Sequence, residues 1–224
     1  MIPRSVGGLV IGYSFLLIAA AEGQVADRGT LIIRRAGQEI GREDFTIKPG
    51  DPDRRTADSL ISVARYPEGH PTATFRSVLE RFSTGAITLR LDQQSAEGSR
   101  QVYATGNRRR VTVRSVALGS ETARDFPGGD PLVLLDDGVF TPFLVAGQLA
   151  TESPTQVWGV YPRSGRRVTF TATRSTAAVN VGGILVTAVR LSGELEGALY
   201  LDDRGRLTRL ELQTADLDVT RLRN

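Results

Sequence analysis

Residues 197–213, GALYLDDRGRLTRLELQ, contain the pattern that decides the fold, because two short apolar runs are joined there by a tight polar turn. The turn is Asp202-Asp203-Arg204-Gly205. Aspartate favours turns because its carboxylate can bond the local backbone, and glycine accepts the positive φ that tight turns require. Two strands connected this directly form an antiparallel hairpin.

Similar short runs of β-branched and apolar residues, separated by Gly, Pro, Asp and Asn, fill most of the chain after Gly29. This is the pattern of strands and turns, and the short connections favour an antiparallel meander. We therefore expect a mainly β protein. The strands expected before the hairpin at residues 197–213 are residues 30–33, 40–47, 59–66, 72–82, 87–91, 101–104, 111–114, 157–161, 167–173, 178–181 and 184–192.

Two of these runs differ in how clearly their pattern distinguishes a strand from a helix. In residues 40–47, Phe45 and Ile47 alternate with polar neighbours, which predicts a strand with one dry face. In residues 72–82, Phe75, Leu79 and Phe82 also fit helical spacing, so a helix is an alternative there.

One short helix is expected near residues 141–149. Thr141 is the predicted N-cap, Pro142 suits the first helical position, and Phe143 begins an apolar run to Leu149. Because Phe143, Leu144 and Val145 surround most of the circumference, the helix should be buried against the sheet or plug its open end.

The N-terminus has the features of a secretion signal. Arg4 precedes an apolar stretch at residues 6–21 that ends in Ala19-Ala20-Ala21. This stretch is short for a spanning helix, so we expect a cleaved signal, cut after Ala21 or Gly23, with an N-terminal membrane anchor as the alternative. The expected organisation is a signal peptide at 1–21 and one β-rich domain at 22–224, with no later transmembrane span. We expect export to the periplasm or the extracellular space.

Composition excludes several kinds of chemistry. The chain has no cysteine, which excludes disulfides, thiol catalysis and a lipid-modified cysteine. Of 28 basic residues only Lys48 is a lysine, and the formal net charge is just +3, which does not favour a nucleic-acid partner. His70 is the only histidine, so no histidine-based metal site or cofactor is expected.

Paired acids occur at Asp51/Asp53, Asp136/Asp137 and Asp202/Asp203. Paired carboxylates can hydrolyse glycosides or bind calcium. Each pair lies beside glycine or proline, however, where aspartate commonly bonds the turn backbone. We favour the turn interpretation and expect no catalytic or metal-binding residue.

Two groups of residues are candidate binding residues. Arg108, Arg109 and Arg110 follow a Gly-Asn turn and could contact an anion or anionic headgroups, or simply form a soluble charged turn. The turn at residues 163–167 is a similar arginine-rich segment. Apolar side chains could line a ligand pocket or belong to the core: Phe140, Phe143, Leu144, Trp158 and Tyr161.

Two stretches carry a resemblance. The opening hairpin at residues 29–47 and the segment at residues 201–211 are similar to uncharacterised exported bacterial proteins with a large curved antiparallel sheet. More remotely they resemble the periplasmic lipoprotein-carrier proteins, in which an unclosed barrel holds acyl chains under a small helical lid. The resemblance implies a half-barrel or unclosed barrel and carries no functional residue.

We therefore expect an exported protein without enzyme activity that binds a hydrophobic ligand or lipid-like group in a curved sheet. One alternative is an interaction or scaffold protein of the cell envelope that accepts a partner strand at a sheet edge. A second alternative is an envelope hydrolase that uses Asp and Glu residues together with His70.

Overall fold

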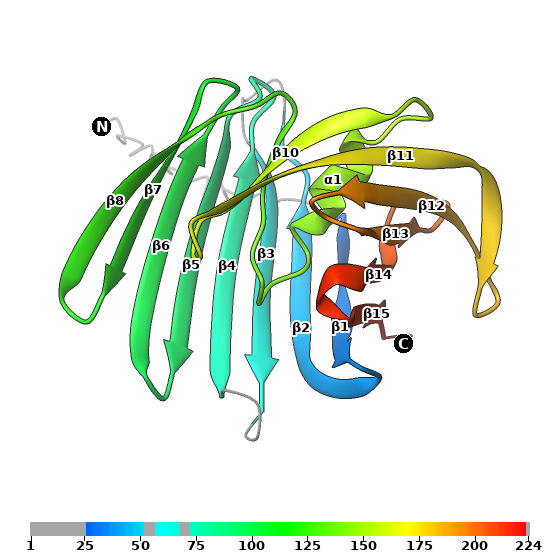
Figure 1. Ribbon diagram of the computed structural model, residues 1–224. Helices are drawn as coiled ribbons and strands as arrows, with labels where there is room; N and C mark the ends of the chain where they lie inside the picture. Colours follow the sequence, from blue (N-terminus) through cyan, green and yellow to red (C-terminus); the bar gives the residue numbers. More distant parts are fainter. Residues whose placement is uncertain (1–25, 52–56, 68–71, 223–224) are drawn as a thin grey trace, which may run out of the picture.

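The computed structural model describes residues 26–51, 57–67 and 72–222. The expected signal at residues 1–21, both cleavage positions, Asp53 and His70 lie outside these ranges. In the described chain, fifteen strands form one sheet in the order β8-β7-β6-β5-β4-β3-β2-β1-β15-β14-β13-β12-β11-β10-β9 (Figure 1).

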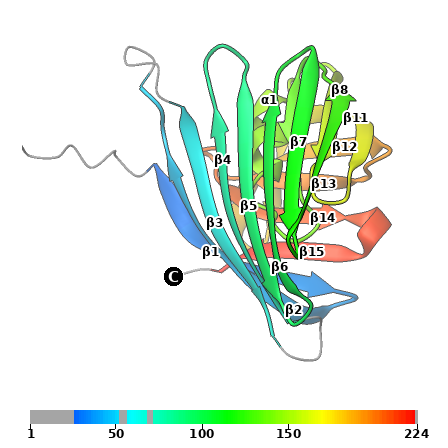
Figure 2. The same ribbon diagram turned by 90° about the vertical axis from the view of Figure 1, so that its left-hand side faces the viewer.

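The first half of the chain is a run of antiparallel hairpins from β1 to β8, which Figure 2 shows as one curved wall. The strands of this half are β1 (Asp27–Arg35), β2 (Gln38–Lys48), β3 (Asp58–Tyr66), β4 (Ala73–Arg81), β5 (Ile87–Ser95), β6 (Gly98–Gly106), β7 (Arg110–Ala117) and β8 (Ser120–Pro127).

The second half returns to the first strand. The last strand, β15, pairs antiparallel with β1, with Leu31 opposite Arg221 and Ile33 opposite Val219. The strands of this half are β9 (Leu132–Leu134), β10 (Thr155–Tyr161), β11 (Arg166–Val181), β12 (Ile184–Gly193), β13 (Gly197–Leu201), β14 (Leu207–Leu212) and β15 (Leu217–Arg221).

The sheet does not close into a barrel. In the part of the chain that the structure describes, its two end strands, β8 and β9, are not neighbours, and β9 pairs only with β10, in parallel. The expectation of a mainly β, unclosed antiparallel meander is therefore confirmed, apart from this one parallel pair. Among the described residues, no helix is both long and apolar enough to cross a membrane.

Alternation decides the identity of β4. Phe75, Ser77 and Leu79 are buried while Arg76 is exposed, and the strand pairs with β3 along its whole length. The helical alternative for residues 72–82 is wrong, because the period of two continues through the polar positions between the apolar ones. The separate strands expected at 167–173 and 178–181 are one strand, β11, with an irregularity between Arg174 and Ala178.

The expected helix is present as α1 (Phe143–Leu149), and its residues from Phe143 to Gly147 are buried. It contacts β9, β11 and β13, so it fills the space inside the curved sheet (Figure 1). The prediction that Thr141 is the N-cap is wrong. Pro142 takes that position, and no side chain caps the helix. The reason is that the Thr141 hydroxyl donates a hydrogen bond to Glu43 instead.

Candidate functional site

A fully buried carboxyl group fixes the approach to α1. Glu43 lies on the inner face of β2 and is 0% exposed. It accepts hydrogen bonds from the backbone N–H groups of Phe140 (2.6 Å) and Thr141 (3.0 Å), and from the Thr141 hydroxyl. Burial raises the pKa of Glu43, and these hydrogen bonds oppose that rise. Glu43 therefore attaches the segment before α1 to the sheet wall.

A buried ion pair holds the other end of this segment. The Asp136 carboxylate accepts from Arg163 Nε at 3.0 Å and Nη2 at 3.1 Å, and from the Gly138 N–H at 2.7 Å. Burial raises the pKa of Asp136, and the ion pair with Arg163 opposes the rise. The Arg163 guanidinium also lies 4.9 Å from the centre of the Phe75 ring. Arg163 is thus held between a carboxylate and an aromatic face.

Beside Arg163 an open cavity of about 530 Å³, which we name the mouth cavity, lies where β1, β3 and β5 end. Its volume is typical of a small-molecule site. Tyr66 and Phe75 meet edge to face with ring centres 5.7 Å apart, and the Tyr66 hydroxyl donates to the Gly138 carbonyl at 3.1 Å. The lining residues are Arg35, Ile40, Tyr66, Thr72, Ala73, Phe75, Gln93, Ser95, Ala96, Glu97, Asp137, Gly138 and Arg163.

Two groups in the mouth cavity have unused capacity. Gln93 Oε1 is buried and has no hydrogen-bond partner within the described chain. Such a group carries a desolvation penalty that a bound donor would remove. Arg35 makes no ion pair with the residues described, whereas Asp137 pairs with Arg166 at 3.1 Å. The cavity thus offers an apolar floor, an unused acceptor and an unpaired cation.

The five apolar candidates from the sequence lie elsewhere. Four are core residues no more than 3% exposed, and Trp158 is half-buried against the core. The five do not line the mouth cavity; they pack around the interior that α1 fills. These residues are Phe140, Phe143, Leu144, Trp158 and Tyr161. Ligand binding by them stays a prediction.

The arginine run lies at the exposed β6–β7 turn. Asn107 Oδ1 accepts from the backbone N–H groups of Arg109 (2.8 Å) and Arg110 (3.2 Å), which shapes the turn. Arg108 faces Asp130 at 3.7 Å, and Arg110 faces Asp125 at 3.3 Å. Two of the three charges are therefore partly compensated, and anion contact by this run stays a prediction.

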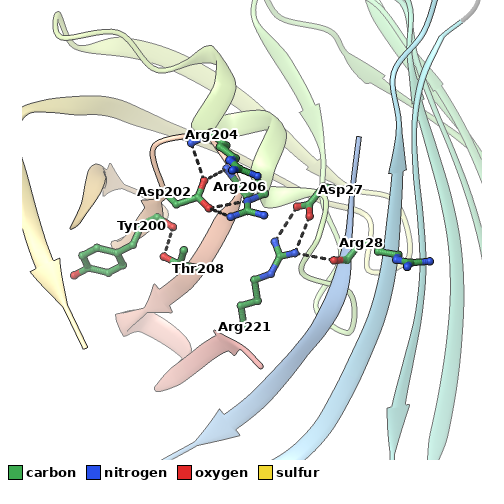
Figure 3. Close-up of polar contacts among 8 residues, drawn as sticks. All are labelled: Asp27, Arg28, Tyr200, Asp202, Arg204, Arg206, Thr208 and Arg221. Carbon is green, nitrogen blue, oxygen red and sulfur yellow. Dashed lines mark hydrogen bonds and ion pairs between the residues drawn. The ribbon is translucent and has the colours of Figure 1, made fainter. Parts of the chain in front are cut away.

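Two further arginines, Arg221 at the end of β15 and Arg206 in the β13–β14 turn, are held by carboxylates (Figure 3). Arg221 donates to Asp27 through Nη1 at 2.8 Å and Nη2 at 2.7 Å, and Nη2 also reaches the Arg28 carbonyl at 2.7 Å. This double ion pair joins the last strand to the first.

Asp202 does the same for the β13–β14 turn. It accepts from Arg206 Nε at 2.7 Å and from the backbone N–H groups of Arg204 (3.0 Å) and Arg206 (2.9 Å), as Figure 3 shows. Burial opposes ionisation, but these hydrogen bonds outweigh it and lower the pKa of Asp202. Asp202 therefore shapes a turn, as the sequence suggested, and its charge is balanced by the ion pair with Arg206.

Sequence reasoning missed Glu43, Gln93 and Arg35. A signal existed for Glu43, because it shares its parity with the inward-facing Phe45 on an alternating strand. A charged residue at an inward position needs partners. In the described ranges, no three His, Asp or Glu side chains form a group that could hold a metal ion.

Comparison with known proteins informs on the fold. No protein-family model matches the chain, and no curated protein is significantly similar to it in sequence. The structure is similar to the crystal structure of a β-barrel-like protein of a domain of unknown function, DUF1849, from Brucella abortus. The match has a TM-score of 0.51 and 13% identity, and covers 87% of this chain and 92% of that chain. At this identity the likeness shows a shared fold.

Proposed function

We propose that this is an exported, non-catalytic protein of the cell envelope that binds a small amphiphile in the mouth cavity. The observation that carries the proposal is the unpartnered Gln93 carbonyl in a cavity floored by Tyr66 and Phe75. Export is supported by the apolar stretch at residues 6–21.

The lining indicates what the ligand needs. Its apolar body would cover Ile40, Tyr66 and Phe75, and burial of apolar area would supply most of the affinity. A hydrogen-bond donor on the ligand would satisfy Gln93, and an acceptor would meet Arg35. A lipid-like molecule with a polar head combines these features.

The buried acids favour binding over hydrolysis. Glu43 is engaged by two backbone N–H groups and a hydroxyl, and Asp136 by Arg163 and the Gly138 N–H. A carboxyl group committed in this way has little freedom to protonate a leaving group in its acid form or to activate a water as a carboxylate.

The test uses the fluorescent amphiphile 1-anilinonaphthalene-8-sulfonate as a probe of the cavity. Gln93→Leu keeps the size of the side chain and removes its polar group. We expect it to raise the free energy of unfolding by about 1 kcal/mol, because a buried unpaired carbonyl is removed. We also expect decanol, added as a competitor, to displace the probe about three- to tenfold less effectively, because one hydrogen bond to the decanol hydroxyl is lost.

The matched control is Gln94→Leu on the same strand, since Gln94 is exposed and lines no part of the mouth cavity. It should change neither quantity. The assignment of the cavity would be refuted if neither Gln93→Leu nor a second variant, Phe75→Ala, changed the binding of the probe.

A second candidate function rests on β8. Among the described strands it pairs only with β7, and its residues from Ser120 to Asp125 are all exposed. Such an edge can accept an extended partner segment, although its charged residues and Pro127 are features that discourage edge pairing. Ala123→Pro would block edge pairing, so capture of a partner protein that survives this change would exclude the second candidate.

A further inference from the structure

A smaller cavity of about 230 Å³ lies on the inner face of β6, β7 and β8, next to the mouth cavity. We name it the anion pocket. Among the described residues, its lining has three arginines, three hydroxyl residues and no acid: Arg100, Val113, Ser115, Ala117, Ser120, Thr122, Arg124, Pro162 and Arg163.

The two cavities adjoin each other, because one residue lines both and two of their other residues face each other. Arg163 lines both cavities. Gln93 of the mouth cavity is directly opposite Arg100 of the anion pocket in the β5–β6 register. Directly opposed side chains on one face of a sheet have Cβ atoms about 5 Å apart. One ligand can therefore reach both.

The arginines of the anion pocket differ from Arg206 and Arg221 in Figure 3. There, Arg206 and Arg221 are each held by a carboxylate. Arg100 and Arg124, in contrast, make no ion pair with any residue that the structure describes. Arg163 is paired with Asp136 through Nε and Nη2, and its Nη1 donors have no acceptor within the described part of the chain.

The acids of β8 lie on the other face of the strand. Glu121 pairs with Arg114, and Asp125 faces Arg110 at 3.3 Å, both across to β7. Because side chains alternate along a strand, Thr122 and Arg124 point to the opposite face from these acids. The sequence of β8 therefore leaves positive charge and hydroxyls on the inner face and ion pairs on the outer one.

We propose that the anion pocket binds the phosphoryl group of an amphiphile whose apolar body occupies the mouth cavity. This inference rests on the proposed function and specifies the head group. A phosphoryl group brings nearly two negative charges and three strong acceptor oxygens. The three guanidinium groups and three hydroxyls of the pocket can donate to all three oxygens of a phosphoryl group. A carboxylate has only two oxygens and would use fewer of these donors.

Isothermal titration with four probes tests the proposal: decyl phosphate, decanoate, decanol and inorganic phosphate. The protein is the chain recovered from the periplasmic fraction of the expressing cell. We expect decyl phosphate to bind at least tenfold more tightly than decanol, and Arg124→Gln to remove about tenfold of the affinity for decyl phosphate while leaving decanol unchanged. Ser115→Ala should weaken decyl phosphate by a smaller factor.

The matched control is Arg76→Gln, because Arg76 is an exposed arginine of β4 that lines neither cavity. It makes the same change in net charge and should alter no affinity. Arg124 is exposed, so its variant should fold, and a thermal melt equal to that of the wild type establishes this.

The probes separate the two ways of failing. Equal affinity for decyl phosphate and decanol overturns the anion pocket and leaves the mouth cavity standing. Binding of inorganic phosphate that depends on Arg124, with no binding of any decyl compound, overturns the proposed function and leaves an anion site. Decanoate bound as tightly as decyl phosphate overturns the phosphoryl assignment.

Discussion

Replacing Glu43 by glutamine should destabilise the protein by about 3 kcal/mol, more than any isosteric change at an exposed glutamate. The carboxyl group presents two acceptor oxygens, one to the Phe140 N–H at 2.6 Å and one to both the N–H and the hydroxyl of Thr141. A glutamine amide has one oxygen, so its NH₂ group must face a donor in either orientation. The less costly orientation leaves the buried Phe140 N–H without an acceptor and opposed to another donor. An unsatisfied buried group costs about 1–3 kcal/mol, and the lost hydrogen bond adds about 1 kcal/mol.

Urea unfolding of wild type and Glu43→Gln, extrapolated to water, measures this difference. For a domain of this size, about 3 kcal/mol corresponds to a fall in Tm of roughly 6–12 °C. Glu80→Gln is the matched control, because Glu80 accepts a hydrogen bond from Thr88 at 3.2 Å in a partly exposed position. It should change stability by less than about 0.5 kcal/mol. A Glu43→Gln variant as stable as this control would refute the view that Glu43 fixes the segment before α1.

Three further predictions concern the same interior. Because burial raises the pKa of Glu43 above its ordinary value of 4.5, its proton-linked stability is complete below that pH and is lost as pH rises through the folded-state pKa. The stability of wild type relative to Glu43→Gln, measured by urea unfolding from pH 4 to pH 8, should therefore fall with pH; a constant difference would contradict the pKa direction. Asp136→Asn should lower the free energy of unfolding by about 2–3 kcal/mol, because it leaves the Arg163 guanidinium, which is 20% exposed, without its carboxylate. The double variant Asp136→Asn/Arg163→Met should recover part of this loss. Gly129→Ala would place its Cβ 2.3 Å from Trp158 Cγ, so it should destabilise by about 1–3 kcal/mol and shift the emission of this single tryptophan; an unchanged spectrum would show that the contact relaxes freely.

Local patterns in the sequence were enough to predict most strands and the helix. The alternation around Phe45 and the turn at Asp202 each depend on neighbours a few residues away. The limits of β11 were harder, because Arg174 to Ala178 interrupts its pairing with β12 without ending the strand. A local break in a pattern and the end of a strand look alike in a sequence.

Contacts between distant segments could not be predicted in this way. The pairing of β1 with β15 joins Leu31 to Arg221, and no period along the chain encodes it. The Thr141 hydroxyl was assigned to the helix N-cap because its real partner, Glu43, is 98 residues away. Non-local partners override local preferences when they offer a buried carboxylate.

The candidate site was missed for a related reason. Gln93 and Arg100 face each other because the β5–β6 hairpin turns at residues 96–97, with Ser95 opposite Gly98. Their side chains are separated in sequence by this turn, and neither belongs to a motif. The sequence analysis predicted aromatic pocket residues instead, and two of them, Phe140 and Tyr161, are core residues at 1% and 2% exposure.

Native mass spectrometry of the protein, isolated intact without detergent from the cells that express it, is the measurement that addresses ligand binding most directly. We predict a wild-type species that carries a small-molecule adduct, lost on denaturation, depleted in Gln93→Leu and retained in Gln94→Leu. A wild-type protein that is free of adduct when isolated, and that takes up no decyl compound afterwards, would contradict the central claim that the mouth cavity is a binding site.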